Sequence, residues 1–295
     1  MSAIWGLILA VFAVSWASIF IRWCGETPAL VISFYRMFWS TLLFSGYQLL
    51  HHPPALRYKT IPNKSKKLFI FAGILLALHF ATWIASIQWT KISHSLILES
   101  THPVFALLLS PFILKEKGSW YTVIAAVLAL CGIMVIAGQD LFSANGKFFG
   151  DMLALAAALF VTLYLLIARH QREMIDLIPY LIAVYAVAAF TLLFLIVLFG
   201  YPLFHYPLTI HFMMFLLAMI PTGIGHSLLN WAARKIPVYK VNFFILGEPL
   251  IASLLAYLFF SEKPYGFFYL GALLISAAII LAVLDQNFFR KVKHE

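Results

Sequence analysis

The chain has 295 residues, of which 63% are hydrophobic and 11% are charged, with a net charge of +9. A soluble domain is about half apolar and about a quarter charged, so this composition excludes a water-soluble globular protein and indicates an integral membrane protein. The positive charge does not indicate nucleic-acid binding, because the basic residues lie in short clusters between apolar runs, as they do in cytoplasmic loops of membrane proteins.

Ten apolar runs are long enough to cross a bilayer, which takes about 20 residues. In chain order they cover residues 4–22, 29–50, 68–89, 93–114, 119–138, 149–168, 178–199, 211–231, 238–260 and 265–284. The first run has no basic segment before it and no cleavage pattern after it, so we expect a retained span rather than a signal peptide. The longest connection, 51–67, is too short for a soluble domain. The sequence predicts an all-α polytopic membrane protein with ten transmembrane helices.

The distribution of Lys and Arg predicts the orientation of these spans. If the N-terminus lies inside, 14 of the 20 basic residues fall in inner segments and 4 in outer segments. The inner ones are Arg57, Lys59, Lys64, Lys66, Lys67, Lys115, Lys117, Arg169, Arg172, Arg234, Lys235, Arg290, Lys291 and Lys293, and the outer ones are Arg22, Lys91, Lys147 and Lys263. This bias predicts that both termini are cytoplasmic.

An internal repeat divides the chain. Residues 103–117 (PVFALLLSPFILKEK) align with 249–263 (PLIASLLAYLFFSEK) at an offset of 146, and 6–16 (GLILAVFAVSW) resembles 150–160 (GDMLALAAALF). Two halves, 1–145 and 146–295, would each hold five spans. Five is odd, so the second half would be inserted in the opposite sense, with Glu116 and Glu262 at opposite faces. Chance similarity between Leu-rich helices is the alternative, but inverted repeats are typical of secondary transporters.

These features carry a family resemblance. The two five-span halves, the "Pro…Glu-Lys" endings of spans four and nine, and the sequence ISFYRMFWSTLL at 32–43 resemble the drug/metabolite transporter superfamily, in particular its EamA-type family. The resemblance covers essentially the whole chain. It implies two inverted five-helix repeats around a central cavity lined by spans one, three, four, six, eight and nine. It also implies export or exchange of small metabolites, often amino acids or related compounds.

Ionisable residues inside spans are costly and usually face a bundle interior or a pathway. His79 and His102 lie near the middle of spans three and four, and Glu248, the repeat counterpart of His102, lies near the middle of span nine. We therefore expect these three side chains to meet at one level in a polar cavity. A buried network that only locks helices together is the alternative. Glu99 lies at the depth of Arg36, which predicts an ion pair that is either structural or part of the site.

The full set of candidates follows from the same reasoning. Predicted substrate-binding residues are Trp16, His79, Trp83, Glu99, His102, Tyr164, His226, Asn230 and Glu248. Predicted hinges, where Pro or Gly interrupts a span, are Pro103, Pro221, Gly223, Gly225 and Pro249, although the residues in span eight also suit close helix contact.

Three functions fit a polar cavity in a membrane. The first is a secondary transporter that moves amino-acid-like or amphiphilic metabolites by alternating access, as exporter or exchanger, with Glu248 and His102 able to carry a proton. The second is a lipid-linked sugar flippase. The third is an intramembrane enzyme built on His94, Glu99 and His102, but matching carboxylates on other helices are lacking.

The predicted partners are a small-molecule substrate and the lipid bilayer, without nucleic acid. Cys24 and Cys131 lie in different apolar regions, so they form neither a disulfide framework nor a metal site. We expect no enzyme activity, cofactor or metal, and a bacterial inner (cytoplasmic) membrane location. The sequence leaves the oligomeric state open and is compatible with a monomer.

Overall fold

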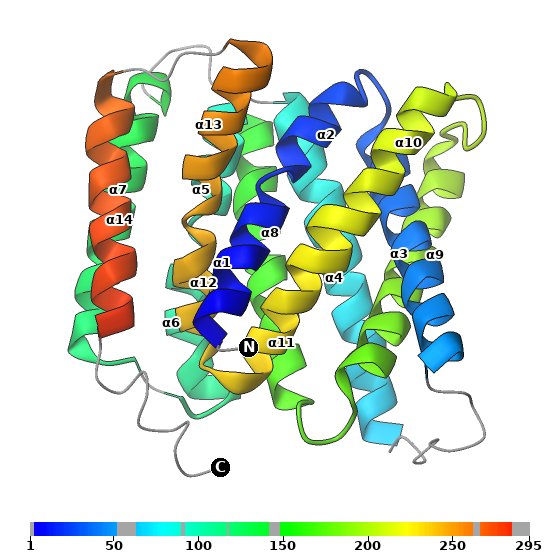
Figure 1. Ribbon diagram of the computed structural model, residues 1–295, viewed down its shortest axis with the longest axis horizontal. Helices are drawn as coiled ribbons and strands as arrows, with labels where there is room; N and C mark the ends of the chain where they lie inside the picture. The colour runs from blue at the N-terminus through cyan, green and yellow to red at the C-terminus, as the bar shows by residue number, and fades with distance from the viewer. Residues whose placement is uncertain are drawn as a thin grey trace.

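The computed structural model describes residues 3–51, 63–89, 92–116, 118–141, 148–261 and 266–284. Within these ranges every regular element is a helix and none is a strand (Figure 1). Seven helices, some of them interrupted, are long and apolar enough to cross a membrane: Ala3–Trp23, Ala29–His51, Lys66–Trp89, Phe148–His170, Leu177–Phe199, Leu208–Lys235 and Val238–Phe260. Shorter apolar helices accompany them, as expected for a polytopic membrane protein.

The helices follow the predicted spans closely. The uninterrupted ones are α3 Ala29–His51, α4 Asn63–Trp89, α7 Trp120–Leu141, α8 Phe148–His170, α9 Leu177–Phe199 and α14 Gly266–Leu284. The span predicted at 211–231 is longer than expected and consists of α10 Leu208–Leu217, the π-helix η2 Ala218–His226 and α11 Ser227–Lys235. Three further predicted spans are each broken into two helices.

These breaks lie near the middle of the first, fourth and ninth predicted spans. The resulting helices are α1 Ala3–Val14 and α2 Ala17–Trp23, α5 Ile92–Glu99 and α6 His102–Ile113, and α12 Val238–Ile245 and α13 Glu248–Phe260. Pro103 and Pro249 are each the second residue of the helix after the break, because proline has no N–H and clashes with the carbonyl four residues earlier. The break at Ser15 contains no proline and was not predicted; the Ser15 hydroxyl donates instead to the carbonyl of Val11 at 2.7 Å, a bond that bends helices.

The π-helix η2 also forms around a proline. Pro221 cannot donate to the carbonyl of Leu217, and the hydroxyl of Thr222 donates to that carbonyl at 3.1 Å. π-Helical segments are rare, and many of those known lie at functional sites. The structure therefore interrupts regular hydrogen bonding in span eight where the sequence predicted a hinge.

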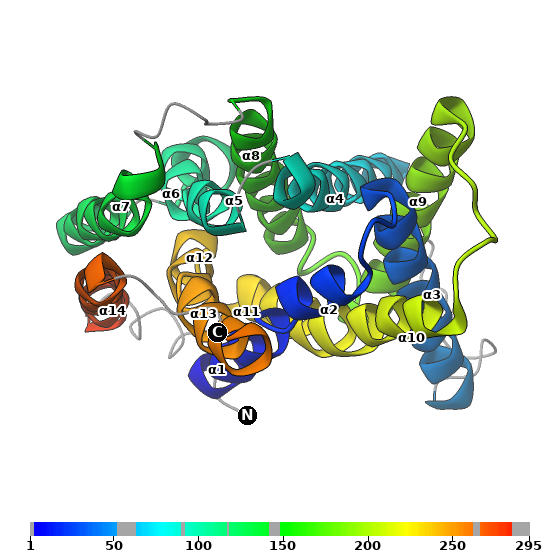
Figure 2. The ribbon, with the colours of Figure 1, turned by 90° about the horizontal axis from the view of Figure 1, so that it is seen from above.

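The helices pack into one bundle (Figure 2). Helix α4 packs against α8 and α9, α1 packs against η2 and α11, and α6 packs against α12 and α8. The pair α7 and α14 lies together at one end of the bundle, away from α3 and α9. The end of the bundle at which α6, α8 and α11 finish is called the lower end, after its place in Figure 1.

Small residues allow some of these helices to approach closely. A Cβ atom on Gly225 would lie 2.5 Å from Cγ1 of Val14, and one on Gly132 would lie 2.8 Å from the carbonyl oxygen of Gly271. Both distances are too short for any side chain, so the backbone of η2 packs against the Val14 side chain of α1, and the backbone of α7 packs against that of α14. At Gly225 the structure shows close helix contact, the second of the two roles that the sequence suggested.

Candidate functional site

A small cavity lies where the broken helices meet. It offers about 30 Å³ to the centres of water molecules, which is room for a few waters. Its walls come from spans one, two, three, four, six, eight and nine. The lining residues are Val14, Ala17, Arg36, His79, Phe80, Trp83, Glu99, His102, Val161, His226, Leu229, Ile245 and Glu248. Six of the nine predicted substrate-binding residues are among them, together with Arg36.

Arg36 supplies the fixed positive charge of this cavity. Its side chain is 1% exposed, its Nε donates to the Thr222 hydroxyl at 2.6 Å, and its guanidinium lies 3.9 Å from the centre of the Phe80 ring. Among the described side chains, the predicted ion pair with Glu99 is not formed. The carboxylate whose charge acts most on Arg36 is Glu248, so the second half of the chain, not the first, supplies its main counter-charge.

Three imidazoles line the same cavity. His79 is held in place, because its Nδ1 lies 3.0 Å from the carbonyl oxygen of Ala157 and its ring is parallel to the ring of Trp83 at 6.3 Å. The ring of His226 lies 6.2 Å from that of His79. Both ring nitrogens of His102 are buried without a hydrogen-bond partner in the described part of the chain. Buried polar atoms are nearly always paired, so this imidazole is available to a ligand or to water.

The two carboxylates stand at the helix breaks. Glu99 is the last residue of α5 and Glu248 is the first residue of α13; both are less than one-tenth exposed, and their charges act on each other. A carboxylate is stabilised at the start of a helix by the helix dipole, as for Glu248, and is disfavoured at the end of one, as for Glu99. Burying both acids beside a single guanidinium is costly, which favours a functional reason for their presence.

The broken backbone at this level is tied to neighbouring spans. The carbonyl of His102 accepts hydrogen bonds from Thr162 Oγ1 and Asn242 Nδ2, both at 3.2 Å. The carbonyl oxygen of Glu248 lies 3.4 Å from Oγ of Ser15, whose proton is shared with the nearer carbonyl of Val11. Irregular backbone inside a membrane is tolerated where protein groups satisfy it or where it lines a cavity, and both conditions hold here.

Three predicted residues do not line this cavity. Trp16 packs against Phe259, with ring centres 5.5 Å apart. Asn230 lies one helical turn below His226, and its Nδ2 donates to the hydroxyl of Tyr164 at 2.5 Å and to the carbonyl of His226 at 2.7 Å. Tyr164 and Asn230 therefore form a polar layer beneath the cavity rather than its wall.

Sequence reasoning missed the apolar part of the wall. Phe80, whose ring lies against the guanidinium of Arg36, gave no signal because it is one of 28 phenylalanines. Val161, Leu229 and Ile245 were equally indistinguishable from ordinary membrane-facing residues. The ionisable members could be found because such residues are rare inside spans.

Comparison with known proteins agrees with this architecture. The model of the EamA-like transporter family matches residues 1–138 and 148–284. The uncharacterized transporter YoaV of Bacillus subtilis is 23% identical over 252 residues, which cover 81% of this chain and 86% of YoaV. The uncharacterized transporter YetK of the same organism is 38% identical over 89 residues, a match that spans 28% of this chain and only 26% of YetK.

A solved crystal structure shares the fold. It superimposes with a TM-score of 0.79 and covers 96% of this chain and 97% of its own, at 16% sequence identity. An all-helical bundle with an interior polar cavity, a family match over both halves and relatives named as transporters indicate a membrane transporter rather than an enzyme. On this evidence the chain belongs to the EamA-like transporter family.

Proposed function

We propose that the protein is a secondary transporter that carries small amphiphilic metabolites, amino acids and amino-acid-like compounds among them, by alternating access. The observation that carries this proposal is the central cavity. It is buried, it lies at three helix breaks, and it combines two carboxylates and a guanidinium with aromatic walls. Discontinuous helices at a midplane site are the usual construction of substrate sites in secondary transporters.

The cavity suits a ligand with charges of both signs. Glu99 and Glu248 offer acceptors for an ammonium group, and Arg36 offers a donor for a carboxylate. Trp83 and Phe80 offer faces for an apolar or cationic part of the same ligand. The present cavity holds only a few waters, so binding of a metabolite requires that the surrounding helices separate.

Alternating access in this proposal uses two inverted halves. Ten spans divide into residues 1–145 and 146–295, and the family model matches each half separately, which supports the division. The cavity draws Glu99 and His102 from the first half and His226 and Glu248 from the second. Movement of one half relative to the other would therefore open the site to either face.

The proposed orientation places the lower end and both termini in the cytoplasm of a bacterium, with the protein in the cytoplasmic (inner) membrane. The excess of Lys and Arg in the corresponding segments supports it. Export or exchange is the proposed direction, with Glu248 and His102 as proton carriers. A transport rate that stays flat between about pH 5.5 and 8, where histidine titrates, would contradict the proton coupling but not the transport.

A binding screen tests the substrate class. Detergent-purified protein is heated with amino acids, amines, nucleobases and organic acids, and stabilisation by bound ligand is measured. We expect an amino-acid-like compound to stabilise the wild type and to lose this effect in Glu248→Gln. The matched control is Glu173→Gln, because the Glu173 side chain is 78% exposed. If no compound stabilises the protein, or if Glu248→Gln responds as the wild type does, the proposed site is wrong and lipid-linked substrates become the better candidates.

A further inference from the structure

One face of span eight carries a file of polar residues from the cavity to the lower end. Thr222, His226, Asn230 and Arg234 lie four residues apart on η2 and α11, so they share a face. Thr222 accepts from Arg36, His226 lines the cavity, and Asn230 bonds to Tyr164. From His226 to Arg234 the file extends about 12 Å along the helix. It therefore connects the proposed binding site with the lower surface.

Two buried polar atoms on or beside this polar file have no partner. They are Oδ1 of Asn230 and the hydroxyl of Tyr180, and within the described residues neither makes a hydrogen bond. Tyr180 lies close enough to Arg234 for the two to interact electrostatically. Unpaired buried polar atoms are few in native proteins and call for an explanation. Their clustering along one route is explained if that route fills with water or ligand in another conformation.

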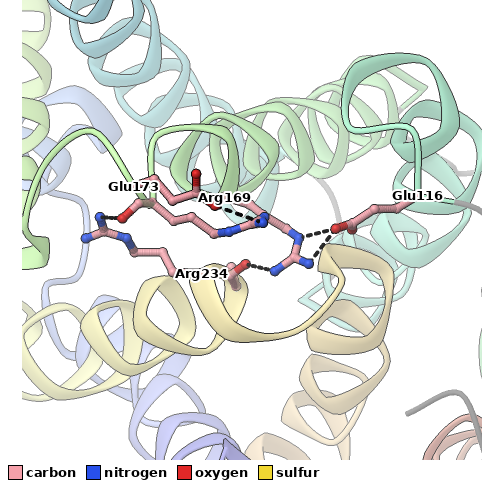
Figure 3. Close-up of polar contacts among 6 residues, drawn as sticks. Glu116, Arg169, Glu173 and Arg234 are labelled. Atoms are coloured by element: carbon pink, nitrogen blue, oxygen red, sulfur yellow. Dashed lines mark hydrogen bonds and ion pairs between the residues drawn. The ribbon is translucent and has the colours of Figure 1, made fainter. Parts of the chain in front are cut away.

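A second buried arginine, Arg169, lies at the lower end of the polar file (Figure 3). Arg169 Nε donates to Oε1 of Glu116 at 2.7 Å, and its Nη2 bonds the same oxygen. Its Nη1 donates to the carbonyl of Ala233 at 3.1 Å. One guanidinium thus ties together the segment that follows α6, the end of α8 and the end of α11.

The same contacts cross the boundary between the two halves of the chain. Glu116 belongs to the first half, and Arg169 and Ala233 belong to the second. The Glu116 and Arg169 side chains are 13% and 7% exposed, so both are largely buried, and Oε2 of Glu116 has no hydrogen-bond partner among the described residues. Separation of the pair at the lower end of the bundle would let water reach both charges, which lowers the cost of breaking the contact. The ion pair therefore links the two halves of the chain by a contact that can break.

We propose that the Glu116–Arg169 pair is a gate that closes the lower end in this structure, and that the polar file on η2 and α11 lines the substrate route when this gate opens. The proposal rests on the proposed alternating-access transporter. The gate proposal specifies which contact must break for the lower end to open, and which helix face the substrate then contacts. Within the repeat, the counterpart of Glu116 is Glu262, which lies outside the described residues.

Cysteine accessibility tests the gate without any substrate. Cys24 and Cys131 are replaced by alanine, and Leu229→Cys serves as reporter because Leu229 lines the cavity and is 2% exposed. A membrane-impermeant maleimide is applied to vesicles of both orientations. We expect Glu116→Gln to raise the labelling rate from the lower side by about ten-fold or more, because the closed state loses the charge pair that stabilises it. Labelling from the opposite side should not rise.

Two further variants define the result. Glu116→Asp keeps the charge but shortens the side chain, so a smaller rise is expected, and it carries the test if Glu116→Gln does not fold. Glu173→Gln removes an exposed carboxylate that pairs with Arg172 at 3.3 Å near the same end, and it should leave labelling unchanged. Size-exclusion profiles identify the folded variants.

The outcomes separate the gate from the proposed function. Unchanged labelling in folded Glu116→Gln, or an equal rise from both sides, would overturn the gate, since the second result indicates general loosening. Suppose that a ligand binds the wild type but not Glu248→Gln, while labelling of the Leu229→Cys reporter stays unchanged in Glu116→Gln. This result would reject only the gate and would leave the transporter proposal intact. A one-sided rise without any ligand in the panel would support the gate and reject the proposed substrate class.

Discussion

Replacing Thr222 by valine tests how strongly the polar centre stabilises the fold. The Thr222 hydroxyl accepts from Nε of Arg36 at 2.6 Å and donates to the carbonyl of Leu217 at 3.1 Å. Valine has the same shape but makes neither bond. A hydrogen bond to a charged group contributes about 1.5–3 kcal/mol and a neutral one about 1 kcal/mol. Arg36 is 1% exposed, so only a water held in the cavity could replace the lost acceptor, and we expect Thr222→Val to lower the free energy of unfolding by about 2–4 kcal/mol.

The assay is unfolding of detergent-purified protein, by SDS titration or heat. The matched control is Thr191→Val in α9, because the Thr191 hydroxyl donates only to Val187 within its own helix, at 2.9 Å. Its loss should cost no more than about 0.5 kcal/mol, the range of ordinary substitutions away from special features. Thr222→Ser retains the hydroxyl and should recover most of the stability. If Thr222→Val loses no more than Thr191→Val, the bond to Arg36 does not stabilise the fold and the reasoning fails.

Three other outcomes follow from the packing. Gly225→Ala should destabilise the protein by about 1–3 kcal/mol through overpacking, because the new Cβ would lie 2.5 Å from Val14 Cγ1. Adding Val14→Ala should restore part of the lost stability. If Gly225→Ala stabilises the protein in the unfolding assay, η2 and α1 are not in close contact at this position. Trp83→Ala should weaken ligand binding more than Trp16→Ala does, since only Trp83 lines the cavity; equal effects on the measured Kd would refute this. Burial raises the pKa of the Cys24 thiol to about 12, so its thiolate is scarce below that pH and maleimide should label it slowly at pH 7 to 9; rapid labelling of the folded protein would show that the thiol is exposed.

Much of the candidate site could be predicted from the sequence. His79, His102 and Glu248 are ionisable residues in the middle of apolar runs, and the repeat offset placed His102 and Glu248 at equivalent positions. Their cost in a membrane requires a polar surrounding, and the structure places all three at one cavity. Such residues can be recognised in a sequence because an ionisable side chain that faces lipid would destabilise the protein.

The partners of these residues could not be predicted. Depth along a span assigned Arg36 to Glu99, but in the structure the guanidinium bonds Thr222 and lies on Phe80. Depth fixes a residue along the membrane normal but not its direction around the bundle axis. That direction depends on how each helix is rotated and on the breaks at Ser15, Glu99 and Glu248, of which the first carries no proline signal.

The sequence by itself determined the class of protein, the approximate ends of the helices and which polar residues had to face inward, because each follows from the cost of exposing polar groups to lipid. Only the tertiary structure decided which inward residues meet. It separated Trp16, Tyr164 and Asn230 from the cavity wall, and it brought Glu116 to Arg169 across 53 residues of chain. Contacts of this kind are set by the packing of whole helices, through close approaches such as Gly225 against Val14, and no local pattern in the sequence encodes them.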